Sequence, residues 1–276
     1  MTTAAERWRS QLAAWAIPDE ILASAPETPY GFPAELFRRR AELAGMRADT
    51  PTTLRSLEAL LEGGTVLDVG VGGGATSLPL AGRAGAIVGF DAGADLLAEF
   101  EAAARAATVQ SRAILGRWPD DEARAPLADV VVCGHVAYNV ADLGPFASAL
   151  DAHATNRVVM ELTDRHPLAW MHDLWERFHG LGRPDGPTAQ DALAVLSEAG
   201  MGPAEELRTV RNDPAGGGFE RREGAIALVR RRLCLPASRD GEIADALGDR
   251  LGKHRDLWGA GTVERTVVTL WWDRAN

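Results

Sequence analysis

The chain has 276 residues, of which 46% are hydrophobic and 25% charged, so it has enough apolar side chains to bury a sizeable core. Its formal net charge is −10, and Lys253 is the only lysine, which argues against the basic face that a nucleic-acid substrate requires. No apolar run is long enough to span a membrane, the first residues predict no secretory signal, and two cysteines (Cys133 and Cys234) are too few for a disulfide framework, so we expect a cytoplasmic protein.

Residues 1–60 predict a helical N-terminal extension ahead of a main domain over residues 61–276. Trp8, Leu12 and Trp15 recur at spacings of four and three, which places them on one face of a first helix. Two more helices are expected over residues 33–46 and 52–61. The second of these begins after Thr50, a good N-cap residue, with a proline in its first turn.

Strands and helices alternate between residues 65 and 162. We expect strands over residues 65–69, 86–90, 109–115, 128–133 and 157–162, and helices over residues 75–83, 95–107 and 143–152. This alternation predicts right-handed βαβ units, and therefore an α/β fold with a doubly wound, mostly parallel sheet.

The C-terminal part predicts a helical insertion and a final strand. The insertion covers residues 163–190, with a helix that begins near His166 and ends at His179. Further helices are expected over residues 188–200, 220–233 and 238–251, and strands over residues 206–211 and 265–272. The histidines at 166, 172 and 179 lack the i, i+4 spacing of a helical metal site, so we expect no metal.

The most informative segment is VLDVGVGGGAT, residues 66–76, where a predicted strand runs into closely spaced glycines. Glycine tolerates positive φ angles and has no Cβ, so a tight turn forms and a ligand can lie against the backbone. The second predicted strand ends at Asp91, 23 residues after Asp68. In doubly wound folds an acid at that point faces the ribose hydroxyls of a cofactor.

Two classes of cofactor fit this turn. Gly70, Gly72 and Ala75 satisfy the dinucleotide-binding pattern, so an NAD(P)-dependent oxidoreductase stays an alternative, although neither tyrosine begins the Tyr-x-x-x-Lys pair of one large oxidoreductase group. Asp68 favours S-adenosylmethionine (SAM). A dinucleotide would bring a pyrophosphate beside this acid, whereas SAM brings an ammonium group that the acid can hold directly or through water.

Asp68, Gly70, Gly72 and Gly74 resemble motif I of the class I SAM-dependent methyltransferases, Asp/Glu-x-Gly-x-Gly-x-Gly. The resemblance covers residues 60–165 well and the C-terminal third only by its order of elements. It implies a Rossmann-like sheet whose final strand is antiparallel, with methyl transfer from SAM as the reaction. In many members of this family, N-terminal additions close over the acceptor, so we expect residues 1–60 to form a lid.

The resemblance also implies where the cofactor binds. The expected contacts are Asp68, Gly70, Val71, Gly72, Gly74, Asp91, Ala92, Trp118 and Cys133. Asp91 would bind the ribose hydroxyls, and the ring of Trp118 could stack on adenine. Arg117 stands where many members of the family carry an acid.

His135 and Tyr138 are the catalytic candidates, because they follow the fourth strand at the sheet edge where reacting groups gather. His135 could act as a base or position the acceptor, and a purely structural histidine is the alternative. The segment lacks the Asn-Pro-Pro-Tyr-type motif of many DNA and protein methyltransferases, so we expect a small-molecule acceptor. A non-catalytic SAM-binding protein of the same fold also stays an alternative.

Overall fold

The computed structural model describes residues 2–31, 33–211, 218–254, 256–262 and 264–274. Its α-helices are α1 (Ala4–Ala13), α2 (Asp19–Ser24), α3 (Ala34–Glu42), α4 (Pro51–Ala59), α5 (Ala94–Ala106), α6 (Leu143–His153), α7 (His172–His179), α8 (Ala189–Glu198), α9 (Arg222–Arg232) and α10 (Asp240–Leu247). Its strands are β1 (Thr65–Val69), β2 (Ala86–Asp91), β3 (Gln110–Leu115), β4 (Ala128–Gly134), β5 (Ala154–Thr163), β6 (Ala204–Arg211), β7 (Leu251–His254), β8 (Leu257–Ala260) and β9 (Glu264–Asp273). None of these helices is long and apolar enough to cross a bilayer.

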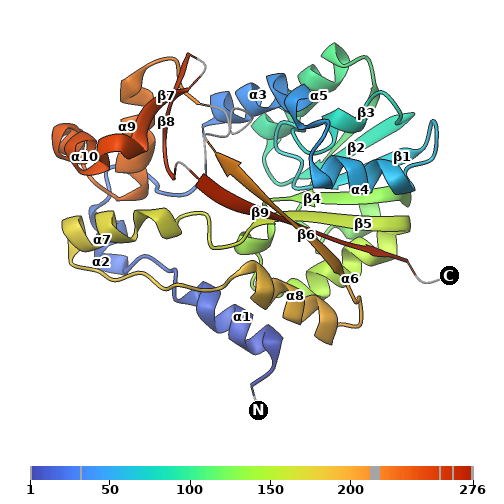
Figure 1. Cartoon of the computed structure of the whole chain (residues 1–276), viewed down its shortest axis with the longest axis horizontal. Helices are drawn as coiled ribbons and strands as arrows, with labels where there is room; N and C mark the ends of the chain where they lie inside the picture. The colour runs from blue at the N-terminus through green and yellow to red at the C-terminus, as the bar shows by residue number, and fades with distance from the viewer. Residues whose placement is uncertain (1, 32, 212–217, 255, 263, 275–276) are drawn as a thin grey trace.

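Among the described residues, seven strands form one sheet in the order β3-β2-β1-β4-β5-β9-β6 (Figure 1). Strands β1 to β5 run parallel, and β9 lies antiparallel between β5 and β6. The predicted α/β class, the doubly wound parallel sheet and the antiparallel final strand are therefore confirmed. The strand order reverses at β1, so the carboxyl ends of β1 and β4 flank the switch point where ligands bind in folds of this kind.

Helices cover both faces of the sheet. On one face Trp8 of α1, Phe146 of α6 and Val195 of α8 belong to the same buried cluster as alternate residues of the central strands. On the other face, α3, α4 and α5 contribute to a second cluster that includes Phe100. Burial on both sides explains why β4 is continuously apolar from Val130 to Cys133 instead of alternating with polar residues.

A third hydrophobic cluster builds a helical module from segments that are distant in the sequence. It joins Ile21 of α2, Trp175 of α7, Ile226 of α9 and Ile243 of α10. The β7–β8 hairpin, which the sequence did not predict, packs on α9 in the same module, and the expected helix over 238–251 ends at Leu247 instead. In Figure 1 this module lies beside the sheet, at the left of the view.

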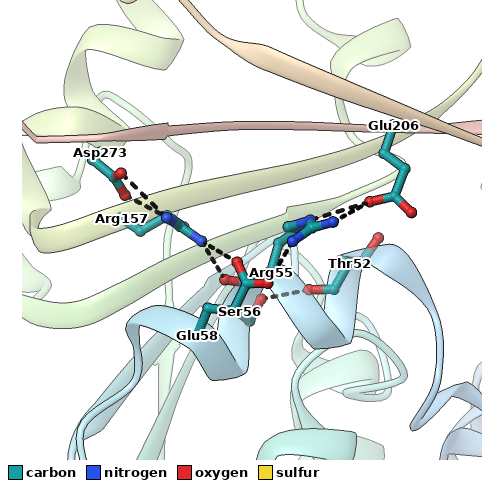
Figure 2. A network of polar contacts seen from close by, with 7 residues as sticks. All are labelled: Thr52, Arg55, Ser56, Glu58, Arg157, Glu206 and Asp273. Carbon is teal, nitrogen blue, oxygen red and sulfur yellow. Dashed lines mark hydrogen bonds and ion pairs between the residues drawn. The ribbon is translucent and has the colours of Figure 1, made fainter.

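Polar contacts attach α4 to three strands of the sheet (Figure 2). Arg55 binds Glu206 of β6 at 2.9 Å, and its guanidinium lies 4.9 Å from the ring centre of Trp271 on β9. Arg157 of β5 binds both Glu58 of α4 and Asp273 of β9. Exposed ion pairs contribute little one by one, but a network of this kind fixes the orientation of the helix.

The helix expected over residues 75–83 is wrong. The structure has only a short 3₁₀ turn there, η2 (Leu78–Leu80), in which the amides of Leu80 and Ala81 donate to carbonyls three residues back. Pro79 has no amide hydrogen to donate, and Gly74 and Gly82 at the two ends are poor helix formers. Helix α3, from the N-terminal segment, packs against α5 in this layer.

The N-terminal segment is distributed over the molecule. Helix α1 packs on α6 and α8, α2 belongs to the helical module, and α3 and α4 lie on the opposite face of the sheet. The lid role of residues 1–60 stays a prediction. Their packing shows in addition that part of this segment completes the core.

Trp8→Ala is expected to lower the free energy of unfolding by about 3–5 kcal/mol, because a large buried side chain is lost. Trp8 is 0% exposed, and its indole N–H donates to the carbonyl of Val140 at 2.8 Å. Arg9→Ala in the same helix is the control, because it removes only an exposed ion pair with Asp142 and should cost less than about 1 kcal/mol. Urea unfolding measures both changes in the free energy of unfolding. Equal losses in the two variants would contradict the conclusion that α1 is part of the core.

Candidate cofactor and acceptor site

The glycine-rich turn after β1 is fastened to the end of β2. The amides of Gly70 and Val71 both donate to the carbonyl of Phe90, at 2.8 and 3.2 Å. The amide of Gly72 donates to Oδ2 of Asp91 at 2.9 Å. Gly70, Gly72 and Gly74 have φ angles of 74°, 52° and 88°, a region that disfavours other residues, so the turn depends on these glycines.

The same glycines let other segments approach the turn closely. A Cβ on Gly72 would lie 2.8 Å from the ring of Phe37 on α3, and a Cβ on Gly70 would collide with Val136. Gly134, at the end of β4, is packed against Thr76 in the same manner. The two residues that flank His135 therefore both touch the segment from Gly70 to Thr76.

Asp68 is a buried carboxyl group at the start of the turn. It is 0% exposed, and neither of its carboxylate oxygens makes a hydrogen bond of good geometry with a described residue, although the polar groups of Ser77 lie close enough to influence it. Burial is the main reason why its pKa rises to about 7; the charge of Asp91 adds to this effect, and the polar groups of Ser77 and the charge of Arg47 partly offset it. A cation placed beside such a carboxyl group would favour its ionised form.

Asp91 closes the other side of the turn, as its place at the end of β2 predicted. Its Oδ1 accepts from the amide of Gly93 at 2.8 Å, and its Oδ2 accepts from the amide of Gly72. The side chain is half-buried, and each oxygen keeps a second lone pair for a hydroxyl donor. Ala92 follows it and is exposed.

Cys133 belongs to the hydrophobic cluster on the face that α1 covers, and Trp118 packs against the same cluster. The ring of Trp118 is partly buried and meets Phe90 and His153 edge-on, at centroid distances of 5.3 and 5.0 Å. Cys133 is buried in β4, and burial raises the pKa of its thiol, so the sulfur stays protonated and packs as a small apolar group.

His135 follows β4 with a backbone in the left-handed region, at a φ of 60°. Its amide donates to the backbone carbonyl of Glu161 at 2.6 Å, and its Nε2 lies 2.9 Å from Oε1 of the same residue. Thr108, Cys234 and Asp256 also have positive φ angles, but His135 is the one of these four that follows a central strand at the switch point. Burial, together with the charges of Arg265 and Arg47, lowers the pKa of His135 although Glu161 acts in the opposite direction.

Glu161 is the centre of a buried polar cluster that the sequence did not predict. Arg47 of η1 (Ala44–Arg47) contacts its two oxygens at 2.5 and 2.6 Å, and the hydroxyl of Thr52 donates to Oε2 at 2.5 Å. Thr52 also contacts Thr269 at 2.9 Å, which is paired with Glu161 in the β5–β9 register. Burial alone would raise the pKa of Glu161, but Arg47, His135 and Thr52 hold it well below its usual range.

Tyr138 lies apart from this cluster, in the core on the face that α1 covers. Its hydroxyl donates to the carbonyl of Thr163 at 2.7 Å, and its ring stacks on Trp8 at 5.6 Å. Burial raises the pKa of the phenol. The structure therefore brings His135 to the glycine turn and gives the hydroxyl of Tyr138 a structural bond.

The fold can now be compared with known proteins. No family model matches the chain, and no curated protein matches its sequence. Among solved structures, the YcgJ protein of Bacillus subtilis is similar at 14% identity and a TM-score of 0.50, covering 82% of this chain and 98% of its own. The magnesium protoporphyrin IX methyltransferase of Synechocystis, solved with S-adenosylhomocysteine, is similar at 16% identity and a TM-score of 0.47, covering 82% of each chain.

A SAM-dependent methyltransferase from Aquifex aeolicus is also similar, at 16% identity and a TM-score of 0.43 over 66% of this chain and 92% of that one. By its sheet topology and its likeness to YcgJ, the chain has a Rossmann-like α/β fold. Its strand order and the antiparallel β9 agree with the architecture that the glycine motif implied. At sequence identities of 14–16% the likeness concerns the fold alone, and the reaction has to be argued from the residues of the site.

Asp68→Asn is expected to become more stable relative to wild type as pH rises. The native carboxyl has a pKa of about 7 against an ordinary value near 3.8, so ionisation above pH 4 destabilises the wild-type fold until pH 7 is passed. The difference in the free energy of unfolding should grow by up to about 4 kcal/mol across this window, at 1.36 kcal/mol per pKa unit. Urea unfolding of both proteins at several pH values measures it, and a constant difference would contradict the raised pKa.

Proposed function

We propose that the chain is a methyltransferase that transfers a methyl group from SAM to a small-molecule acceptor. The observation that carries this proposal is the buried carboxyl of Asp68, which makes no hydrogen bond of good geometry with the described residues and lies at the switch point of the sheet. A phosphate-bearing cofactor would be repelled there, whereas the ammonium group of SAM supplies the missing partner.

The residues present at the turn fit SAM. Asp68 would hold the ammonium group, directly or through water, and Asp91 would accept hydrogen bonds from the ribose hydroxyls while it keeps those from Gly72 and Gly93. Trp118 is the candidate neighbour of the adenine. When bound, SAM supplies a methyl group on a positively charged sulfur, which an acceptor nucleophile can displace.

The contribution of the chain is to position groups and to exclude water. Phe37 and the rest of α3 cover Gly72 and Gly73, so α3 shields this part of the turn from solvent. Val136 and Thr76 bring the end of β4, and with it His135, against the turn. Alignment of an acceptor in a site of this kind supplies much of the rate of a displacement reaction. The overall negative charge of the chain favours a small acceptor over a nucleic acid.

SAM and S-adenosylhomocysteine are expected to stabilise the protein against heat, by about 2.7 kcal/mol at a hundredfold excess over Kd. Asp91→Ala should abolish the shift in melting temperature, because the ribose hydroxyls lose their acceptor. Asp95→Ala is the matched control, since Asp95 is an exposed acid on α5 and should leave the shift unchanged. NADH and NADPH should have no effect. Stabilisation by these nicotinamide cofactors alone would overturn the proposal in favour of an oxidoreductase.

The affinity for SAM is expected to rise with pH between about pH 5 and pH 7, because only the ionised carboxylate of Asp68 attracts the ammonium group. Asp68→Asn should bind more weakly at pH 7 and lose this pH dependence. Isothermal titration calorimetry of both proteins with SAM measures the effect. An affinity of wild type that does not change over this range would show that Asp68 does not contact the cofactor's charge.

A further inference from the structure

The ring and the backbone of His135 are both attached to one residue, Glu161. The amide of His135 donates to the carbonyl of Glu161, and the ring nitrogen Nε2 lies 2.9 Å from its carboxylate. Two attachments to a residue inside β5 remove most of the freedom of a side chain that is otherwise 31% exposed. The position of the ring is thus set by the sheet and not by the loop that follows β4.

The partners of Glu161 decide which ring nitrogen carries the proton. Arg47 and Thr52 donate to the carboxylate, and both interactions favour its ionised form. An ionised carboxylate can only accept, and a bare lone pair on Nε2 would be repelled at 2.9 Å from it, so this contact requires a proton on Nε2. In the neutral ring Nδ1 then carries the lone pair, and it has no hydrogen-bond partner among the residues that the structure describes.

Burial of the ring is the main reason why its neutral form is favoured, and charges from three residues act on it as well. Glu161 on β5 faces it with one negative charge, while Arg47 on η1 and Arg265 on β9 contribute positive charges. Together with burial, the two arginines outweigh the carboxylate, so the pKa of His135 is lowered. The positive charges of Arg47 and Arg265 would also stabilise an acceptor oxygen beside the ring that becomes negative as it loses its proton.

We propose that Glu161 is a positioning residue that holds His135 as a base for an acceptor hydroxyl. This rests on the function proposed above. The acceptor's O–H proton moves to Nδ1, and the oxygen's freed electron pair forms the bond to the methyl carbon while the carbon–sulfur bond breaks with its pair left on sulfur. His135 becomes the imidazolium ion, which Glu161 stabilises and which returns the proton to solvent. A neutral amine attacks the methyl carbon without first losing a proton and needs no base. A base held at this position is therefore suited to an acceptor hydroxyl, which must lose its proton.

The test is nuclear magnetic resonance of the full chain with ¹⁵N-labelled histidine, without any ligand. The His135 signals are assigned by their absence from His135→Asn. At neutral pH we expect a slowly exchanging proton on Nε2 and the chemical shift of an unprotonated nitrogen at Nδ1. A proton on Nδ1, or an imidazolium ion at neutral pH, would overturn the proposal, and this spectrum of the wild type, once His135 is assigned, decides it whether or not the Glu161 variants fold.

Variants then test the role of Glu161. Glu161→Ala should lose the slowly exchanging Nε2 proton, whereas Glu161→Gln keeps an uncharged acceptor oxygen and should keep the proton with a signal moved upfield. Glu205→Ala, an exposed glutamate on β6, is the control and should leave the spectrum unchanged. An unchanged Nε2 signal in both Glu161 variants would overturn the proposal. Because no cofactor is present, this result is independent of SAM binding, whose absence would instead refute the proposed methyltransferase.

Discussion

The buried carboxylate of Glu161 is the interaction on which the rest of the site depends. Its side chain is 3% exposed, and a charge in that position is costly unless donors surround it. The donors come from Arg47 of η1, Thr52 of α4 and the loop that carries His135. Stabilisation of the Glu161 carboxylate therefore depends on contacts between the N-terminal segment, the end of β4 and β5. The ion pairs of Arg55 and Arg157 hold α4 in the place from which Thr52 reaches it (Figure 2).

Two buried carboxyl groups near the switch point have opposite surroundings. Glu161 has an arginine, a hydroxyl and an imidazole, and its pKa is held low. Asp68 lies two strands away with no hydrogen bond of good geometry among the described residues, and its pKa rises to about 7. Groups whose pKa values are driven apart in this manner have different chemical roles. Here the carboxylate of Glu161 organises the chain's own residues, and that of Asp68 is the one that we propose for the ammonium group of SAM.

The glycines of the turn serve packing, in addition to the ligand approach that we propose for them. Gly72 and Gly70 give their side-chain space to Phe37 and Val136, so the N-terminal helix α3 and the end of β4 reach the turn. In this layer α3 packs beside α5, while the segment after the turn forms only the short η2. The N-terminal segment is for this reason part of the site and of the core, in addition to any part it takes in closing over an acceptor.

The sequence by itself determined the order of the strands along the chain, the glycine turn and the acids at the ends of β1 and β2. Apolar runs bounded by glycine and an acidic residue predict buried strands, because a strand buried on both faces has a continuous apolar sequence with no alternating polar residues. The fold class followed from these local signals. The structure of residues 75–83 did not follow from these signals. Their composition predicted a helix, whereas Pro79 and the packing of α3 favour a tighter turn.

Only the tertiary structure decided which polar residues act together. Arg47 and Thr52 are separated from Glu161 by 114 and 109 positions in the sequence, and neither lies in a motif that predicts the contact. Glu161 itself gave only a weak signal, as an acid in an apolar strand. Tyr138 was close to His135 in the sequence, yet a 3₁₀ turn places its hydroxyl on the carbonyl of Thr163. Local pattern fixes where strands begin and end, whereas the partners of a buried charge depend on which segments the sheet order brings together.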